Sequence, residues 1–396
     1  MGSDQHYAQQ DAQVVWQDDE PFHVEAQGHS LTIYPAGEDR LQALVEMING
    51  AQSSLRLFYY MFVDDEIGTR VRDALVEAAR RGVSVTLIVD GFGEDVAEDF
   101  FDGFKEVGGQ YDRFMAKWSR RALIRNHQKM AIVDEKVAMI GGFNIEKAYF
   151  EGPEANGWHD LGVKLEGQAV EQLLAWWDEL ADWVAQPRAQ FRSIVSKVTK
   201  WSPPKGPVRL LIGGPTKGLS SWARCVSEDL EKGDCLDMVM AYFSPSKKML
   251  RRIGQTALRG EARLVMAAKS DNGATIGATR SLYHYLLNKN AKIWEFRPCK
   301  LHMKLLVIDD AVYLGSANFD MRSLYVNLEL MLRIEDADFA DRMRDFIAQH
   351  HTASKQITAK EHRKHSTLWN RIRWNLSWFL VAVVDYNVAR RLNLGL

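Results

Sequence analysis

The sequence predicts an α/β protein in which one α/β unit is repeated twice in tandem. Three observations support this prediction. Strand-like and helix-like stretches alternate between residues 41 and 89, the same rhythm returns after residue 207, and each half contains one His-x-Lys-x4-Asp motif. The chain has 396 residues, which is enough for two domains or for one large duplicated unit. We expect the two units to pack as a pair related by a pseudo-twofold axis.

The first unit opens with helices and strands in alternation. Residues 41–48 carry apolar side chains at helical spacing, and residues 55–62 (LRLFYYMF) form a candidate buried strand. A second amphipathic helix over 67–81 ends at a glycine, before the strand-like run 83–89 (VSVTLIV). A Trp-rich helix over 170–184 follows the first motif. This order predicts a largely buried sheet covered by helices.

The clearest linker is the Pro- and Gly-containing stretch 201–207 (WSPPKGP), which separates the two units. After it, residues 236–243 (LDMVMAYF) resemble residues 55–62, and the alternation of helices and strands begins again. We therefore expect a polar tail at 1–28, a first unit at 29–200, the linker at 201–207, a second unit at 208–352, and a basic and apolar C-terminal segment at 353–396.

Composition narrows the class of protein. The net charge is -2, so the chain lacks the global basic field of a dedicated nucleic-acid binder. Cys225, Cys235 and Cys299 form no CxxC pair, and their odd number favours a reducing, cytosolic setting over a disulfide framework or structural zinc. The first 20 residues contain no apolar signal region, and no apolar run is long enough to predict a spanning helix.

The two motifs carry the chemistry. The first consists of His127, Lys129 and Asp134, followed by Gly141-Gly142-Phe143-Asn144. The second consists of His302, Lys304 and Asp309, followed by Gly315-Ser316-Ala317-Asn318. Two such motifs, each followed at nearly equal distance by Gly-Gly or Gly-Ser and then Asn, are not a chance pattern.

Strand geometry predicts how each motif is used. The residues between Lys and Asp are apolar and strand-like, and a strand sends residues i and i+2 to one face, so His and Lys point the same way. A returning strand would then bring Gly142 and Asn144, or Ser316 and Asn318, beside that face. An imidazole, an ammonium, backbone N–H groups and a carboxamide together suit a tetrahedral phosphate.

The paired motifs resemble those of the phospholipase D superfamily. Further segments are similar to bacterial cardiolipin synthases within it, among them YYMFVDDEIG (59–68), IGGFN (140–144), Trp158-His159-Asp160 and GSANFDMRSLYVNLE (315–329). The similarity covers roughly residues 30 to 350. It implies two tandem phospholipase D-like α/β sandwich repeats that share one active site.

The resemblance also implies a two-step mechanism through a phosphohistidine, with no metal and no other cofactor. By analogy His127 is the nucleophile and His302 the acid and base, although the pseudo-symmetry of the sequence does not fix that order. Lys129, Lys304, Asn144 and Asn318 would neutralise the phosphate oxygens. The gap between Asp309 and Gly315 is one residue shorter than that between Asp134 and Gly141, so we expect a tighter second hairpin.

Four acids accompany the motifs. A histidine in this role needs a carboxylate on its far nitrogen, and Asp160 and Glu329 are the candidates; the alternative is that each is an ordinary surface or salt-bridged acid. Asp134 and Asp309 begin hairpin turns, and we interpret them as holding the loop while the chemistry is done elsewhere.

Two basic regions bear on the substrate. Arg120, Arg121 and Arg125, near Trp118, either hold an anionic headgroup or form a solvated basic face. Residues 355–373 carry six Lys or Arg against one Glu and lead into the apolar run 374–384 (WNLSWFLVAVV). This pattern favours docking on an anionic membrane over docking on the protein core.

Three functions fit these features. The first is a phosphatidyltransferase that makes cardiolipin from phosphatidylglycerol or a related phospholipid, bound peripherally at the cytoplasmic face of the cell membrane. The second is a hydrolytic phospholipase D, which differs in admitting water. The third is a nuclease of the same superfamily, which the near-neutral net charge disfavours, so we expect no nucleic-acid partner. The duplication completes a site within one chain, so none of these needs a second subunit.

Overall fold

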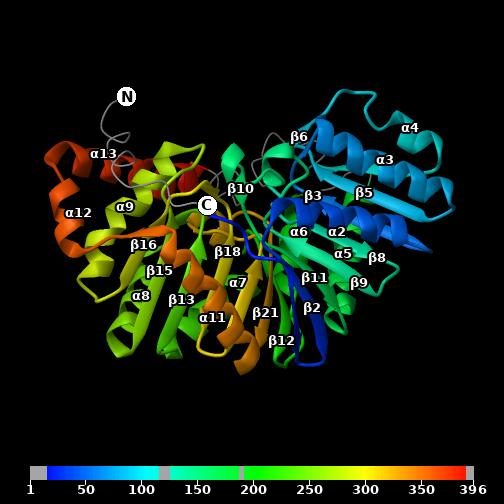
Figure 1. Ribbon diagram of the computed structural model, residues 1–396. Helices are drawn as coiled ribbons and strands as arrows, with labels where there is room; N and C mark the ends of the chain where they lie inside the picture. The colour runs from blue at the N-terminus through cyan, green and yellow to red at the C-terminus, as the bar shows by residue number, and fades with distance from the viewer. Residues whose placement is uncertain (1–15, 116–124, 187–190, 389–396) are drawn as a thin grey trace.

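The computed structural model describes residues 16–115, 125–186 and 191–388. Two eight-stranded mixed sheets stand side by side, one in each half of the chain (Figure 1). The first sheet has the strand order β1 (Phe22–Ala26), β2 (His29–Tyr34), β11 (Gly162–Glu166), β9 (Val137–Gly141), β8 (Met130–Val133), β3 (Ser54–Tyr59), β5 (Ser84–Asp90) and β7 (Gln110–Phe114).

The second sheet repeats the order of the first sheet from β2 to β7, without a counterpart of β1 and with one further strand at the opposite edge. Its strands are β12 (Val208–Gly213), β21 (Glu329–Glu335), β19 (Ala311–Gly315), β18 (Lys304–Ile308), β13 (Cys235–Met240), β15 (Glu261–Ala267), β16 (Lys292–Phe296) and β22 (Ser354–Gln356). In both sheets the motif strand, β8 or β18, pairs antiparallel with the strand that opens the β-α-β unit, β3 or β13. The predicted α/β class and the tandem duplication are therefore confirmed.

Helices cover both sheets. They are α2 (Gly37–Gly50), α3 (Glu66–Arg80), α4 (Asp102–Glu106), α5 (Ala169–Ala185), α6 (Phe191–Lys200), α7 (Ser221–Lys232), α8 (Lys247–Arg259), α9 (Gly273–Leu287), α10 (Met321–Tyr325), α11 (Ala337–Thr352), α12 (Ala359–His365) and α13 (Leu368–Trp378), with the single turns η1 (Lys147–Tyr149) and η2 (Pro153–Ala155) and the π-helix η3 (Phe379–Asp385). Among the described residues no helix is both long and apolar enough to cross a bilayer.

The core has three parts. One cluster lies between α2, α3 and the first sheet, and a matching cluster lies between α7, α8, α9 and the second sheet. A third cluster joins side chains of both sheets with those of α5 and α11, so the two units share a hydrophobic interface. Trp176 and Trp183 of α5 are buried there, and each large apolar side chain buried this way contributes about 1.5–3 kcal/mol.

The sheets extend beyond two of the boundaries expected from the sequence. β1 pairs with β2 across a turn at Gln27 and Gly28, both at positive φ, so the expected boundary at residue 28 falls inside a hairpin. β22 pairs with β16, so the second sheet continues past residue 352. The edge strand β1 (FHVEA) mixes polar and apolar side chains and the edge strand β22 (SKQ) is entirely polar, so neither shows a strand-like hydrophobic pattern. The expected linker at 201–207 does lie between α6 and β12.

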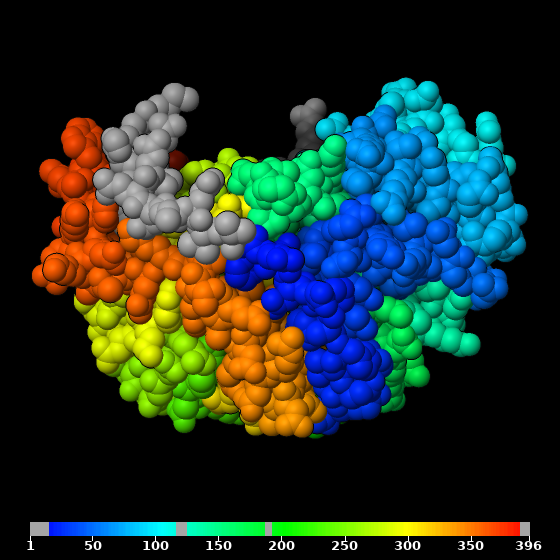
Figure 2. Space-filling model, viewed as in Figure 1, coloured from blue at the N-terminus to red at the C-terminus, as the bar shows by residue number. Residues whose placement is uncertain are grey.

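The C-terminal helices lie on the second unit. α13 packs against α9 and buries Trp374, and Asp385 of η3 forms an ion pair with Arg322 of α10 at 2.9 Å. Figure 1 shows α13 at the same end of the molecule as β10 (Trp158–His159), a short strand next to the site. In Figure 2 the two units sit side by side, the blue-to-green first unit against the yellow-to-orange second.

Candidate active site

The two motif histidines meet between the units. The ring centroids of His127 and His302 are 6.4 Å apart, and each histidine lies just before its motif strand, β8 or β18. Both rings are held by backbone pairing to the opposite half: His127 N donates to Leu328 O at 2.8 Å, and His302 N donates to His159 O at 2.8 Å. One shared site between two units is therefore what the fold provides.

The backbone also decides which acid reaches which histidine. The residue before each histidine pairs in parallel with the residue before an acid of the other half: Leu301 of β17 (Lys300–Leu301) with His159 of β10, and Asn126 with Leu328. Asp160 therefore lies beside His302, and Glu329 lies beside His127. These reciprocal bridges are the contacts expected of a pair related by a pseudo-twofold axis.

The side-chain contacts are crossed in the same way. His302 Nδ1 lies 2.6 Å from Asp160 Oδ2, and His127 Nδ1 lies 3.3 Å from Glu329 Oε2. A carboxylate on Nδ1 fixes the tautomer and the ring plane and leaves Nε2 for the reacting group. Both acids are fully buried, and the neighbouring charges keep their pKa values below the usual range although burial raises them.

Gly142 and Ser316 occupy equivalent positions in the two halves, and each contacts its neighbouring acid in a different way. Ser316 Oγ donates to Glu329 Oε2 at 2.6 Å. A Cβ at Gly142 would lie 2.6 Å from Asp160 Oδ1, so the carboxylate fills the place of a side chain there. The shorter Asp160 thus packs directly against glycine backbone, whereas the longer Glu329 is steadied by a hydroxyl.

Two buried lysines supply positive charge. Lys129 and Lys304 are 1% and 2% exposed, and each Nζ donates to the backbone carbonyl of the histidine in its own motif. Burial lowers the pKa of Lys304 to about 8 and that of Lys129 well below its usual value, while Glu329 and Asp160 oppose the shift. Buried ammonium groups whose charge is only partly matched form a receptor for an anion.

Asn144 and Asn318 complete the polar lining, and both are almost fully buried. Asn144 Nδ2 donates to Tyr149 Oη at 2.9 Å. In both asparagines Oδ1 has no hydrogen-bond partner within the part of the chain that the structure describes. Buried amide atoms without partners, in both halves and at matching positions, indicate where a bound group completes the site.

The protonation of the histidines follows from their burial. Burial, and then the charge of Lys129, lowers the pKa of His127 to about 4. Burial and Lys304 lower the pKa of His302 to about 3. Both rings are therefore neutral at neutral pH in the protein alone, and a bound phosphodiester would raise both pKa values through its negative charge.

Asp134 and Asp309 lie at the far ends of the motif strands, away from the histidines. Asp134 accepts hydrogen bonds from the N–H groups of Gln52, Ser53 and Ser54 at 2.7–2.9 Å. Burial raises its pKa, but these bonds outweigh burial and lower it to about 2. Asp309 accepts from Asp234 N and Cys235 N at 3.1 and 2.9 Å. Each acid fastens its hairpin to the strand beside it and touches no reacting group.

Three further residues shape the site and carry no motif in the sequence. Tyr149 Oη lies 3.5 Å from His302 Nε2, the ring nitrogen that does not contact Asp160. The ring of Tyr60 lies 5.0 Å from that of His127, and Lys129 Nζ lies 5.2 Å from the centre of the same tyrosine ring. Arg40 is buried and donates to the carbonyls of Asp160 and Tyr149 at 2.6 and 2.7 Å. Only Tyr60 lay in a segment that the sequence singled out.

Of the expected basic cluster, Arg125 is exposed and precedes the His127 segment, and its carbonyl accepts from Leu328 N at 3.0 Å. Trp118, Arg120 and Arg121 lie outside the described residues. Across the described residues, no group of three or more His, Cys, Asp or Glu is placed to hold a metal ion.

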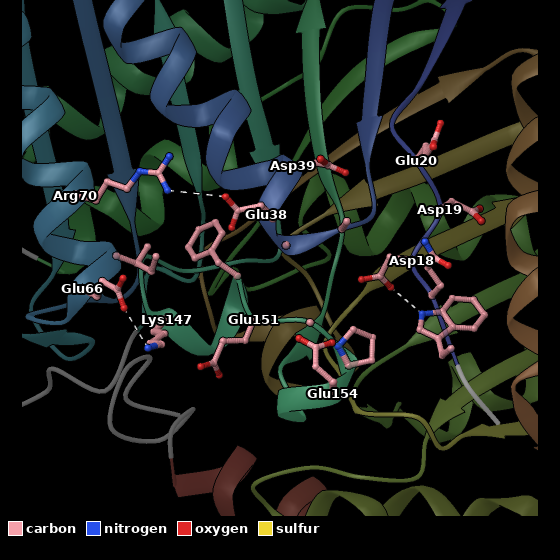
Figure 3. Close-up of a pocket in the computed structure, with 18 residues that line it drawn as sticks. Asp18, Asp19, Glu20, Glu38, Asp39, Glu66, Arg70, Lys147, Glu151 and Glu154 are labelled. Carbon is pink, nitrogen blue, oxygen red and sulfur yellow. Dashed lines mark hydrogen bonds and ion pairs between the residues drawn. The ribbon is translucent and has the colours of Figure 1, made fainter. Parts of the chain in front are cut away.

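A separate cavity of about 770 Å³ lies beside α2 and η2 and repels anions by its lining (Figure 3). Lys147 pairs with Glu66 at 3.1 Å, and Arg70 lies 4.0 Å from Glu38. Against these two cations stand the eight carboxylates of Asp18, Asp19, Glu20, Glu38, Asp39, Glu66, Glu151 and Glu154. This cavity is therefore not the phosphate site.

Two His-Lys-Asn sets with crossed carboxylates, on a duplicated α/β fold, define an enzyme of the phospholipase D class. The chain belongs to the family described as "Cardiolipin synthase, PLD-like domain", which matches residues 44–180 and 229–351. The resemblance noted in the sequence is thereby confirmed.

Known proteins extend the match. The chain is 27% identical to the major cardiolipin synthase ClsA of Bacillus subtilis, over 91% of this chain and 77% of that protein. It is 30% identical to cardiolipin synthase 1 of Staphylococcus aureus (strain MRSA252), over 82% of this chain and 68% of that one. A crystal structure of phosphatidylserine synthase from Haemophilus influenzae has the same fold, with a TM-score of 0.72 at 13% identity over 93% of this chain and 96% of that one.

Proposed function

We propose that this protein is a phosphatidyltransferase of the cardiolipin synthase type, with phosphatidylglycerol as donor and an alcohol as acceptor. The observation that carries the proposal is the pair of crossed histidine–carboxylate contacts, His302 with Asp160 and His127 with Glu329, above two buried lysines. The choice of substrate is supported by the relatives, which are named cardiolipin synthases and align over most of the chain.

The reaction takes two displacements at phosphorus. In the first, His127 Nε2 forms a bond to phosphorus as the bond to the leaving alcohol breaks, and His302, which the negative charge of the bound phosphodiester keeps protonated, gives that alcohol the proton of its Nε2. In the second, His302 removes the proton of the incoming alcohol, whose oxygen bonds to phosphorus as the phosphorus–nitrogen bond breaks. His302 thus gives one proton in the first step and regains one in the second, so the two steps together leave its protonation unchanged.

The differences between the two histidines support this order. The His127 side chain is 13% exposed, whereas that of His302 is 4% exposed. Tyr149 Oη is placed 3.5 Å from His302 Nε2, where it can orient an alcohol oxygen during proton transfer. The more accessible ring, facing the donor, is the better nucleophile, and the enclosed ring beside a hydroxyl is the better proton carrier.

The phosphate would be held by side chains alone. Lys129 and Lys304, with the amides of Asn144 and Asn318, supply donors from both halves, and these donors are in place before the charge develops. We propose that the transfer is independent of metal ions because these four groups perform the neutralisation that metal ions perform in other phosphoryl-transfer enzymes.

We further propose that the enzyme works while bound peripherally to a membrane. The C-terminal helices expose an apolar row, made up of Leu368, Trp369, Ile372, Leu376, Phe379, Leu380, Val384 and Val388. Exposed cations of α12 and α13 flank this row, and their charge suits the anionic cytoplasmic leaflet. The ion pair between Arg322 and Asp385 ties the end of the row to α10, which follows Asn318 and thus adjoins the site.

The test is turnover of phosphatidylglycerol vesicles by purified protein in EDTA, beside His127→Ala, with lipids separated after incubation. We expect cardiolipin and released glycerol from the wild type and neither from the variant. Phosphatidic acid as the sole lipid product would instead establish the hydrolase. Cleavage of a nucleic-acid diester with no phospholipid turnover would refute the lipid assignment. Activity that EDTA removes and magnesium restores would refute metal independence.

A further inference from the structure

A second cavity of about 360 Å³ lies between α9, α12 and α13, away from the two catalytic histidines. We call it the C-terminal cavity. It is lined by Arg280, Ser281, His284, Leu287, Asn288, Ala359, His362, Arg363, Ser366, Arg371, Trp374 and Asn375. None of these residues takes part in the active site described above.

His362 is one of two buried polar side chains that line this cavity, the other being Arg280. His362 is 6% exposed, and its ring stacks on Trp374 with centroids 5.5 Å apart and an interplanar angle of 18°. Its Nδ1 is buried and has no hydrogen-bond partner among the residues that the structure describes. A buried nitrogen of this kind is unfavourable unless a bound group satisfies it, so the histidine indicates a ligand with a hydrogen-bonding atom.

The charge around the cavity shows which ligand that is. Arg280 is matched by Glu295, to which it donates two hydrogen bonds at 2.8 and 2.9 Å. Arg363 and Arg371 are exposed, and neither is paired with a carboxylate of the described chain. No Asp or Glu stands among the lining residues, all of which are described. Two unmatched guanidinium groups beside a buried imidazole form a receptor for a phosphate.

The protonation of His362 fits an anion. Burial, and then the neighbouring His284, lowers the pKa of His362 to about 4, so its ring is neutral at neutral pH. A neutral imidazole carries one N–H, and an anion beside Nδ1 selects the tautomer that places the hydrogen on that nitrogen. The ring then donates to the anion and needs no extra proton.

The position of the cavity on α13 connects the phosphate to lipid. Arg371, Trp374 and Asn375 line the cavity, while Ile372 and Leu376 belong to the apolar row on the adjacent face of the same helix. If the apolar row enters the boundary between headgroups and acyl chains, the cavity lies at the depth of the lipid phosphates.

We propose that the C-terminal cavity binds the phosphate of an anionic phospholipid headgroup, separately from the active site, and thereby fixes the C-terminal helices on the membrane. The inference rests on the membrane contact of the proposed function and adds a specific binding site for a lipid phosphate to it. It predicts that two of the basic residues matter for lipid binding far more than their equally charged neighbours do.

The test is co-sedimentation of the full chain with phosphatidylcholine vesicles that contain 0 or about 30% phosphatidylglycerol, an anionic fraction chosen to reproduce a bacterial surface charge. The variant Arg363→Gln/Arg371→Gln removes the two unmatched cations of the cavity. The matched control is Lys360→Gln/Lys364→Gln, which removes the same charge from exposed positions of α12 outside the cavity lining. Thermal unfolding checks that both variants are folded.

We expect the arginine variant to bind anionic vesicles at least about tenfold more weakly than the lysine variant, because diffuse attraction falls equally in both. Equal losses would overturn the proposal. A second arm adds sn-glycerol 3-phosphate without vesicles. If it raises the melting temperature of the wild type but not that of the arginine variant, at concentrations that leave vesicle binding unchanged, the cavity takes a soluble phosphate and the lipid assignment is overturned.

These measurements are independent of turnover. Wild-type protein that makes cardiolipin, with equal binding by the two variants, would remove the cavity proposal and leave the enzyme function intact. A binding difference in a protein that turns over no phospholipid would do the reverse.

Discussion

His302 Nδ1 and Asp160 Oδ2 are 2.6 Å apart, whereas His127 Nδ1 and Glu329 Oε2 are 3.3 Å apart, although the two halves of the site descend from one unit. The His302 half is the more enclosed, with Tyr149 over the ring and Gly142 against the acid. The His127 half is more open, and its Nδ1 also faces Ser316 O at 3.3 Å. A duplicated site can thus divide two tasks by adjusting enclosure while keeping the histidine, lysine and asparagine of each half.

Removing each histidine has the largest expected effect and tests that division directly. His127→Ala and His302→Ala should each lower kcat by about 10⁴-fold or more, since each step needs both groups. They should differ in what accumulates. With a phosphatidyl donor whose leaving group needs no proton, such as p-nitrophenol, His302→Ala should still form the phosphohistidine, and His127→Ala should not.

The measurement is a rapid alkaline quench with donor labelled at phosphorus, followed by counting of protein-bound label. A phosphohistidine trapped in His127→Ala, with none in His302→Ala, would exchange the two roles and show that enclosure does not decide them.

Substitution of the two carboxylates that contact the histidines should have the next largest effect on kcat. The acid with the shorter contact should matter more. Asp160→Asn should lower kcat by about 10³-fold, because the close contact to His302 Nδ1 then holds the wrong tautomer. Glu329→Gln should lower it by about 10²-fold, because His127 keeps the carbonyl of Ser316 as a second acceptor. Initial rates in mixed micelles measure both. The reverse ranking would show that the longer contact is the more important one in catalysis.

The pH profile tests whether the buried lysines of the two motifs must be charged. Burial lowers the pKa of Lys304 to about 8, and the ammonium must be charged to neutralise phosphate. A lysine is charged below its pKa, so kcat/KM should fall about tenfold per pH unit as pH rises beyond about 8. Rates between pH 6 and 10 measure this, and a profile that stays flat to pH 10 contradicts it. Lys304→Arg should move the fall to higher pH if the guanidinium fits.

The crossed pairing explains what sequence reasoning could and could not reach. The motifs identified both histidines, both lysines and both asparagines because their spacing repeats within the chain. The partner of each histidine could not be predicted, since Asp160 follows the first motif in sequence but contacts the second in space. That contact depends on the parallel bridge between β10 and β17, which joins residues of different units.

Other residues and strands were not predicted from the sequence, for different physical reasons. Buried strands such as β18 were predicted because the side chains that follow Lys304 are all apolar, whereas β22 was missed because an edge strand needs no such pattern. Arg40 donates to backbone carbonyls and Tyr149 contacts the Asn144 amide and the His302 ring, and no sequence spacing marks either residue. The sequence favoured membrane over core for the C-terminal run, yet α13 buries Trp374 and also exposes the apolar row.

Substitutions at the two positions that contact the acids should have a smaller effect, mainly on stability. Gly142→Ala should destabilise the fold by about 1–3 kcal/mol and lower activity, because its Cβ would lie 2.6 Å from Asp160 Oδ1. Ser316→Ala should destabilise by about 1–2 kcal/mol, since Glu329 then loses the hydroxyl that donates at 2.6 Å. Urea unfolding measures both. A Gly142→Ala variant as stable as the wild type would mean that Asp160 is not confined as the distances indicate.

The smallest effect concerns the third residue of each motif, which lies outside the site in both halves. Asp134 accepts three backbone N–H groups and Ser53 Oγ, whereas Asp309 accepts two N–H groups, so Asp134→Asn should destabilise the fold more. With discount for solvent screening at this partly exposed turn, we expect a loss of about 1 kcal/mol in the free energy of unfolding, with kcat within about twofold of wild type.

Because the folded-state pKa of Asp134 is depressed from 3.8 to about 2, its contribution to stability is present above pH 4 and is lost as pH falls toward 2. Unfolding free energies of wild type and Asp134→Asn should therefore converge over that interval. A loss of kcat in a stably folded Asp134→Asn would place this acid in the chemistry and contradict its distance from the histidines.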